Sequence, residues 1–501
     1  MTEPDLVSTA VPTVTAVTAA QLTAALPPPR RMDAGTLAAH VAAGKRVVVL
    51  DDDPTGTQTI ADLPVLTRWS VSDLRWALQQ PTTGFFILTN SRSLGESDAT
   101  VRNQRIARAL ADAALAEGVT CVLASRGDST LRGHYPLETD VLVAELAAQG
   151  TPTDGVVIVP AYIEPGRITV NSVHWMQSPE GMIPVGQSEF ARDASFGYRH
   201  SDLRDWVEEK TGGRVRAVDV VPITLDDLRT GGPDRVHAIL SGLTGARTVV
   251  VDAVCDDDLA VLASALIRAE SDGKNFVYRT GPSFVRIRCG QHASPPITGE
   301  RIADIRRGAP ADADDTRPRS RRGVIVVGSH VGLTSRQLDR LRADGNIVEL
   351  ELDVPTLLDP AQHDEHIAEV ARRAGAVLCD ADATTDVVIR TSRTLVTGVD
   401  AHDSLVIART VSAALVTTVR TVVGAVRPAF VVAKGGITSS DTATEGLAIR
   451  RAWARGTLLP GIVSVWEPVD GPAAGIPYVV FAGNVGDDDA LAAVVATLRS
   501  A

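Results

Sequence analysis

The first half of the chain repeats one pattern, in which a short apolar run ends abruptly in polar residues or glycine. The runs occupy residues 47–50, 84–88, 120–124, 155–159 and 248–253. Between two of them, residues 101–113 space their apolar positions as one face of a helix. Continuous apolar runs are typical of strands that are covered on both faces. Strands that alternate with helices predict an α/β fold with a doubly wound, mostly parallel sheet.

The second half repeats this pattern with glycine-rich turns. Residues 323–328, 429–433 and 477–481 are expected strands, each followed by glycine together with Ser, Thr or Asn. Thr334 and Gln337 fit a capping box at the start of a helix. A later helix is expected to place Gly446, Ile449 and Trp453 on one face and to end at Gly456. The second half is therefore predicted to be another α/β domain with a mostly parallel sheet flanked by helices.

Changes in composition divide the chain into four parts. Residues 1–44 are expected to be a partly disordered extension, and residues 45–290 the first α/β domain. Residues 291–322, rich in Pro, Asp and Arg, are expected to be a linker, and residues 323–501 the second domain. Within the first domain, residues 163–213 show little periodicity and are expected to be loop-rich, as a lid or an insertion. We expect the active site in the cleft between the two domains.

Composition narrows the classes of partner. The 501 residues carry a net charge of −12, which argues against nucleic acid or an anionic membrane as the main partner. The four cysteines are far apart and predict reduced thiols. No apolar run has the length of about 18 residues that a transmembrane helix needs, and the N-terminus lacks a signal-peptide pattern. We expect a cytoplasmic protein that binds a small molecule, and a homo-oligomer is compatible with these features.

Charged and hydroxyl side chains follow the expected strands of the first half. They are Asp52, Asp53, Arg92, Arg126, Asp128, Ser129 and Arg132. Guanidinium groups suit a carboxylate, and an aspartate can bind hydroxyl groups or accept the proton of one. Ligands bind at the carboxyl ends of parallel strands, so these side chains indicate one site. Ion pairs that only support the fold, and a helix N-cap at residues 128–130, are the alternatives.

Three junctions between a strand and a helix in the second half contain glycine. They lie at residues 328–334, 434–441 and 483–486. Glycine lets the backbone approach a ligand, and free N–H groups at a helix start bind anions, so the junctions together favour phosphate binding. Neither a G-x-x-x-x-G-K-[ST] motif nor a G-x-G-x-x-G motif at a helix start is present. Lys434 either neutralises phosphate charge or is an exposed lysine at a strand end.

A different interpretation begins from the aspartates after the first strand. Asp51-x-Asp53-x-Thr55 matches the first motif of haloacid-dehalogenase-type phosphatases, in which one Asp is the nucleophile and the other the acid/base. This interpretation leaves the glycine-containing junctions unexplained. A non-catalytic sensor of sugar acids is a third alternative.

Taken in order, the motifs resemble those of the four-carbon acid sugar kinase family, formerly a domain of unknown function. The resemblance covers the chain from about residue 45 to its end. Its motifs are Asp52-Asp53-x-Thr55-Gly56, Ser91-Arg92-Ser93, Asp128-Ser129-Thr130-Leu131-Arg132-Gly133, Gly166-Arg167-Ile168-Thr169, Gly328-Ser329, Lys434-Gly435-Gly436-Ile437-Thr438 and Gly483-Asn484-Val485-Gly486. Two positions depart from the family pattern, because Asp51 stands where Ala is common and Arg126 where Lys is common.

The resemblance implies an N-terminal sugar-binding domain and a C-terminal nucleotide-binding domain. It implies ATP-dependent phosphorylation of the terminal hydroxyl of an acid such as threonate, erythronate or a 3-oxo-tetronate, and we expect Mg²⁺ to bridge the ATP phosphates. Carried over by motif, the residues that face the acid sugar are Asp52, Asp53, Arg92, Asp128, Ser129, Thr130 and Arg132, with Asp53 as the candidate base. The residues that face ATP are Ser329, Gly435, Gly436, Ile437, Thr438 and Gly483. The metal ligands are left open.

Overall fold

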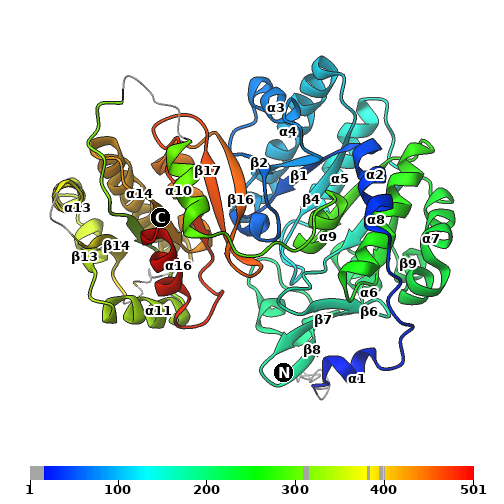
Figure 1. The fold of residues 1–501 in the computed structure, drawn as a ribbon. Coiled ribbons are helices and arrows are strands. Elements are labelled where there is room, and N and C mark those ends of the chain that lie inside the picture. Colours follow the sequence, from blue (N-terminus) through cyan, green and yellow to red (C-terminus); the bar gives the residue numbers. More distant parts are fainter. Residues whose placement is uncertain (1–15, 309–314, 381–383, 394–395, 397–398, 400) are drawn as a thin grey trace, which may run out of the picture.

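The fold is built on one large sheet that crosses the whole molecule (Figure 1). The computed structural model describes residues 16–308, 315–380, 384–393, 396, 399 and 401–501. The strand order is β13-β14-β12-β15-β18-β17-β16-β2-β3-β1-β4-β11-β5-β10-β9. We predicted an α/β protein with a mostly parallel sheet in each half, and this is confirmed. The structure adds that the two sheets are joined, because β16 (Arg451–Leu459) pairs antiparallel with β2 (Leu63–Leu66).

The N-terminal half of the sheet is parallel throughout. Its further strands are β1 (Arg46–Asp51), β3 (Gly84–Leu88), β4 (Cys121–Arg126), β5 (Gly155–Val159), β9 (Val221–Ile223), β10 (Arg247–Val251) and β11 (Phe276–Thr280). β1 lies between β3 and β4, which explains why its valines are buried on both faces. One face is covered by α3 (Val71–Leu78), α4 (Glu96–Glu117) and α5 (Leu137–Ala148). The other is covered by α2 (Ala34–Ala43), α7 (Gly232–Ser241), α8 (Asp256–Ser271) and α9 (Pro282–Arg288).

The C-terminal half has the same layered construction. Its further strands are β12 (Val324–Val327), β13 (Ile347–Leu352), β14 (Asp386–Thr391), β15 (Val431–Lys434), β17 (Ile462–Pro468) and β18 (Tyr478–Phe481). All are parallel except β17, which forms an antiparallel hairpin with β16 and pairs antiparallel with β18. One face is covered by α10 (Gly299–Arg307), α11 (Gly332–Ala343) and α16 (Ala490–Arg499). The other is covered by α12 (Val354–Leu358), α13 (His363–Cys379) and α14 (Ala401–Ala425).

Residues 163–213 are more regular than the sequence predicted. They form an antiparallel sheet of β6 (Arg167–Val170), β7 (Val173–Ser178) and β8 (Gly181–Pro184), followed by α6 (Leu203–Lys210). α1 (Ala19–Thr23) lies beside this small sheet, and Val17 forms a bridge to Met182 (Figure 1). The expectation of a loop-rich segment is wrong, because strands as short as these leave little periodic signal in a sequence.

The helix expected to end at Gly456 is much shorter. α15 spans Gly436–Asp441 and continues as a π-helical turn, and the chain then enters β16. Along β16, Ala452 and Ala454 are buried whereas Trp453 is half-buried, which is the period of two that a strand shows. The prediction was wrong because Gly446, Ile449 and Trp453 happened to fall at helical spacing, although the segment from Arg451 forms a hairpin with β17, which follows directly.

The segments outside the two expected domains carry helices. α10, within residues 291–322, buries Ile302 and Ile305 against the C-terminal half. α2, within residues 1–44, buries Leu37 and Val41 against α8. Residues 1–15, where part of the disorder was expected, lie outside the described residues.

Among the described residues, one helix is long and apolar enough to cross a membrane by length and composition alone. It is Val406–Ala425 of α14, and 44% of its apolar window is buried inside the structure. Leu415, Val419 and Val422 from this helix belong to the main hydrophobic core. α14 is therefore accounted for as a core helix of the C-terminal half.

Candidate active site

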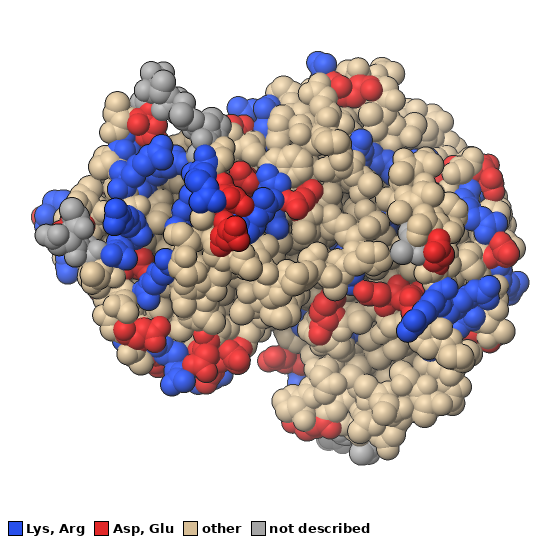
Figure 2. Space-filling view, in the orientation of Figure 1, with Lys and Arg blue, Asp and Glu red and all other residues tan. Residues whose placement is uncertain are grey.

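A cleft with a volume of about 750 Å³ lies between the two halves, at the carboxyl ends of their parallel strands. Figure 2 shows the two halves parted at the lower edge of the molecule. The predicted residues that line the cleft are Asp53, Arg92, Asp128, Ser129 and Arg132 from one half and Ser329, Gly435, Gly436, Ile437, Thr438 and Gly483 from the other. Asp52 and Thr130 are buried behind this surface. The structure thus gathers the predicted set around one cavity.

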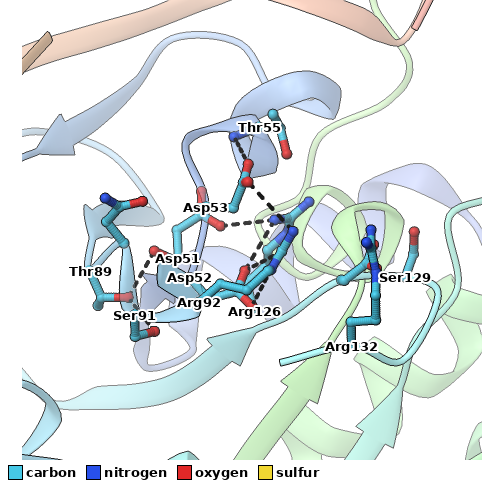
Figure 3. Close-up of polar contacts among 12 residues, drawn as sticks. Asp51, Asp52, Asp53, Thr55, Thr89, Ser91, Arg92, Arg126, Ser129 and Arg132 are labelled. Atoms are coloured by element: carbon cyan, nitrogen blue, oxygen red, sulfur yellow. Dashed lines mark hydrogen bonds and ion pairs between the residues drawn. The ribbon is translucent and has the colours of Figure 1, made fainter. Parts of the chain in front are cut away.

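Arg92 is engaged by the aspartates after β1 (Figure 3). Its Nη2 and Nε donate to the two carboxylate oxygens of Asp52 at 2.6 and 3.1 Å, and its Nη1 lies 3.5 Å from Asp53. The Asp52 side chain is 1% exposed. A buried carboxylate is stable only when it is paired, and a two-point bond to arginine is among the strongest pairings. Arg92 therefore holds Asp52 in place, an internal ion pair of the kind that the sequence left as an alternative.

Replacing Arg92 by alanine is expected to cost about 3–5 kcal/mol of unfolding free energy, because Asp52 is left buried with only the longer contact of 3.5 Å to Arg126. Urea denaturation measures the loss. Arg75→Ala is the matched control, since Arg75 pairs with Glu117 at 2.6 Å but is 48% exposed; we expect it to cost about 1 kcal/mol or less. Equal losses in the two variants would contradict the assignment of Arg92 to the fold.

Asp51 is buried and does not line the cleft. Its carboxyl group packs against the α-carbon of Gly56, where any side chain would collide with it. One oxygen accepts from Arg126 Nη1 at 3.2 Å, and the residue is 2% exposed. Burial raises the pKa of Asp51 to about 8. Asp51 is therefore inaccessible to a phosphate ester, so the geometry does not favour it as the nucleophile of a phosphatase.

Asp53 reaches the opposite wall of the cleft. It caps the 3₁₀ turn Pro54–Thr59, where its Oδ1 accepts from the backbone N–H of Thr55 at 2.8 Å. Its Oδ2 lies only 3.2 Å from where a Cβ on Gly436 would stand. Burial alone would raise the pKa of Asp53, but Arg92, Arg126 and the bonds from Thr55 outweigh it, and the pKa lies below its usual range. Asp53 is therefore an ionised carboxylate at the meeting point of the two halves.

At the other end of the wall formed by the N-terminal half, arginines surround Asp128. Asp128 accepts from Arg132 Nε at 2.7 Å and also from the hydroxyl of Thr130. Burial would raise the pKa of Asp128, but Arg92, Arg132 and Arg167 hold it well below its usual range. The Nε of Arg132 is thus engaged by Asp128, and its Nη1 lies 3.5 Å from Asp193.

Arg167 was not a predicted site residue in its own right, although it belongs to one of the family motifs. It begins β6, lines the cleft, and donates from Nη1 to the Ser129 hydroxyl at 2.7 Å. No carboxylate among the described residues forms an ion pair with it, and it is half-buried. Its segment had no periodicity to place it, so only the motif could have pointed to it.

The glycines of the C-terminal wall pack around two hydroxyl residues. Gly435 has φ 125°, a conformation that favours glycine, and a Cβ there would lie 3.0 Å from Thr438 Oγ1. A Cβ on Gly483 would lie 2.6 Å from Ser329 Oγ. α15 begins at Gly436, and the first N–H groups of a helix have no partner within it. Three loops thus bring backbone and hydroxyl donors to one place, as phosphate binding requires.

Thr334 and Gln337 hold these loops together and do not form the expected capping box. α11 begins at Gly332, so both residues lie inside the helix. The Thr334 hydroxyl donates to the Gly483 carbonyl at 3.0 Å, and Gln337 Nε2 donates to the Asp487 carbonyl at 2.7 Å. The spacing of a capping box was present, but the side chains serve a contact between distant loops.

Lys434 is neither exposed nor turned into the cleft, which corrects both sequence interpretations. Its side chain is fully buried, and Nζ donates to the Ala482 carbonyl at 2.7 Å. The Phe481 ring centroid lies 3.7 Å from Nζ. Burial lowers the pKa of Lys434 to about 7. Lys434 therefore ties β15 to the loop after β18.

The structure does not identify residues that would hold a metal ion. No cluster of three or more His, Cys, Asp or Glu side chains that could hold a metal ion occurs in the part of the chain that the structure describes. The acidic side chains that line the cleft are Asp53, Asp128 and Glu164.

Domain comparisons match both halves. A model described as a sugar-binding N-terminal domain matches residues 47–288, and one described as a nucleotide-binding C-terminal domain matches residues 324–491. The fold and the cleft thus define a two-domain protein that joins a sugar-binding to a nucleotide-binding domain. The chain belongs to the four-carbon acid sugar kinase family, as its motifs predicted.

Individual relatives are distant. The chain is 26% identical over 340 residues to D-erythronate kinase from Heliobacterium modesticaldum, covering 66% of this chain and 67% of that protein. It is similar in structure to Haemophilus influenzae protein HI1011, with a TM-score of 0.57, 19% identity and coverage of 90% of this chain and 100% of the other. A Salmonella typhimurium LT2 protein, provisionally named a tRNA synthase, gives a TM-score of 0.63 at 18% identity, with 89% and 98% covered. The two structural likenesses show the fold alone.

Proposed function

We propose that the protein is an ATP-dependent kinase that phosphorylates the terminal hydroxyl of a four-carbon acid sugar. The observation that carries the proposal is the approach of Asp53 to Gly436, with 3.2 Å between its Oδ2 and a Cβ position on that glycine. A carboxylate that can orient a hydroxyl is thereby placed beside the loop best suited to a γ-phosphate. Phosphoryl transfer asks mainly for such positioning and for charge stabilisation.

The sugar side of the cleft binds the acid. Arg167, with Ser129 beside it, binds the substrate carboxylate, because its guanidinium group has no acidic partner among the described residues. Arg132 and Asp128 contact the hydroxyl groups. Asp52 and Thr130 act from behind, through Arg92 and Asp128 respectively. At the other end of the substrate, Asp53 accepts the proton of the terminal hydroxyl. The oxygen of that hydroxyl forms a bond to the γ-phosphorus, and the bond from the γ-phosphorus to ADP breaks.

The C-terminal wall binds ATP. The backbone N–H groups of Gly436 and Ile437 and the hydroxyls of Ser329 and Thr438 donate to the phosphates. The N–H of Gly435 already donates to the Phe481 carbonyl at 2.8 Å, so Gly435 contributes by letting the backbone approach the ligand. The side chains of Ile437 and Val331 stay 61% and 46% exposed in the cleft and suit the apolar face of a base. Mg²⁺ commonly binds through substrate phosphates and one or two carboxylates, so the small number of acidic side chains in the cleft fits MgATP.

A coupled assay of ADP release tests the function. The purified protein with MgATP is given threonate, erythronate and 3-oxo-tetronates of both configurations, and acid-dependent ADP release with at least one of them is expected. Release without dependence on any acid would contradict the proposal. Hydrolysis of phosphate esters in the absence of ATP would instead identify a phosphatase, and binding of an acid without turnover would identify a sensor.

A further inference from the structure

A second concave site lies at the opposite end of the nucleotide-binding domain. It has a volume of about 520 Å³, and we call it the arginine pocket after six of its lining residues: Arg306, Arg319, Arg321, Arg322, Arg427 and Arg499. Residues 318–322 form it together with residues 427–429, through hydrogen bonds of 2.8 Å from Ser320 N to Arg427 O and from Ala429 N to Arg322 O. Lys and Arg side chains gather over this part of the molecule around α10 in Figure 2.

Three of these arginines have a clear role in the fold. Arg306 donates to the carbonyls of Leu498 and Ala501 at 2.7 Å, and Arg499 pairs with Asp386 at 2.6 Å. Arg427 lies 3.4 Å from Asp315, which has a closer partner in Arg317 at 2.7 Å. α10, α14 and α16 all end nearby, and cations near the carbonyl ends of helices are stabilising.

Arg319 and Arg321 are not explained in this way. Both side chains are exposed and make no hydrogen bond or ion pair with any residue that the structure describes. Burial, and after it the nearby Arg319, hold the pKa of Arg427 below its usual range. Among the residues that the structure describes, no Asp or Glu lines the pocket, although the chain as a whole carries a net charge of −12. Asp386 and Asp315 offset the charges of Arg499 and Arg427, whereas Arg319 and Arg321 add further positive charge to the concave site at an electrostatic cost.

We propose that the arginine pocket binds a small phosphate-bearing anion at a site separate from the cleft. Guanidinium groups match phosphate oxygens with pairs of parallel hydrogen bonds, and several of them converge here from separate segments. The volume accommodates ligands from pyrophosphate to a nucleoside monophosphate. β12 and β15 run from this pocket to the loops at Ser329 and Gly435, a length of about 13 Å for a strand of four residues. The proposed kinase reaction does not use this site, so binding here would be an additional function of the protein.

The test separates this pocket from the cleft, which would itself bind phosphates. The full-length protein is first saturated with a non-hydrolysable ATP analogue, and pyrophosphate is then titrated by calorimetry. One remaining site per chain is expected. Its affinity should fall at least about tenfold in the Arg319→Ala/Arg321→Ala double variant. Arg336→Ala/Arg340→Ala is the matched control, because these exposed arginines of the same domain pair with Asp488 and Asp489, and it should bind as the wild type does.

The outcomes of this test are distinct. The proposal would be overturned if no pyrophosphate site remained after saturation with the ATP analogue. It would also be overturned if the wild type and the Arg319/Arg321 variant bound pyrophosphate with equal affinity, because the binding would then be adventitious only. If the ATP analogue did not bind, only the proposed kinase function would be contradicted. The difference in pyrophosphate affinity between the wild type and the Arg319→Ala/Arg321→Ala variant would still test the arginine pocket. A parallel titration with AMP identifies the source of the phosphate: tighter binding than pyrophosphate supports a nucleotide, and weaker binding supports a smaller phosphate compound.

Discussion

Replacing Asp53 by asparagine should lower kcat by about 10²–10⁴-fold, the range typical of losing a general base. The Kd for ATP should stay within about twofold, because the phosphate loops keep their shape. Asparagine preserves the size of the side chain and its bond from Thr55, but it cannot accept the proton of the substrate hydroxyl. Initial-rate kinetics together with equilibrium binding of ATP measure both effects. An unchanged kcat would remove Asp53 from the reaction.

Asp51→Asn is the matched control for this prediction. Burial raises the pKa of Asp51 to about 8, which favours the neutral carboxyl group, and asparagine matches that group in size and can still accept from Arg126. We expect kcat to change by about threefold or less. A phosphatase that uses Asp51 as nucleophile would instead lose all activity in this variant, so the pair of variants separates the two reactions.

Replacing Arg167 by alanine should raise the KM for the acid sugar by about 10²-fold, with the KM for ATP nearly unchanged. The reason is that Arg167 is the half-buried guanidinium group of the cleft without an acidic partner among the described residues, so its charge is available to the substrate. Arg167→Lys keeps the charge but loses the two-point geometry, and its KM should lie between those of the wild type and the alanine variant.

A substrate without the carboxylate tests whether Arg167 acts through charge. The wild-type protein should prefer the acid to the corresponding four-carbon sugar alcohol, and Arg167→Ala should remove most of that preference. If the variant weakened both substrates equally, Arg167 would be shaping the cleft and not binding the carboxylate. This comparison distinguishes the specific role from general damage to the wall that Arg167 shares with Ser129.

Local sequence patterns were sufficient to predict the strands whose polar carboxyl ends form the cleft. The run before Asp51 and the one before Ser329 are continuous apolar segments, and parallel strands place such ends at one edge of a sheet. For the same reason the predicted residues could be assigned to one site before their contacts were known. The contacts among these residues were not predictable, because Arg92 can bond to Asp52 only when β1 and β3 pair.

Three residues were misjudged for the same physical reason, which is distance along the chain. Thr334 resembled a helix cap, but its hydroxyl donates to the carbonyl of Gly483, 149 residues away. Lys434 could be placed at a strand end, but its burial against Phe481 depends on the pairing of β15 with β18. Arg167 stands in a segment of short strands with little periodicity. Each required a contact that no local pattern encodes.

The pairing of β2 with β16 has a consequence for synthesis of the protein. Leu66 pairs with Arg451, so the ribosome must add 385 further residues after Leu66 before this pair can form. At about 5–20 residues per second, that takes about 20–80 s. Throughout this time the outer edge of β2 has no native partner, and an open strand edge is a template for pairing with other chains. The nascent N-terminal domain therefore depends on protection from association until its distant strand emerges.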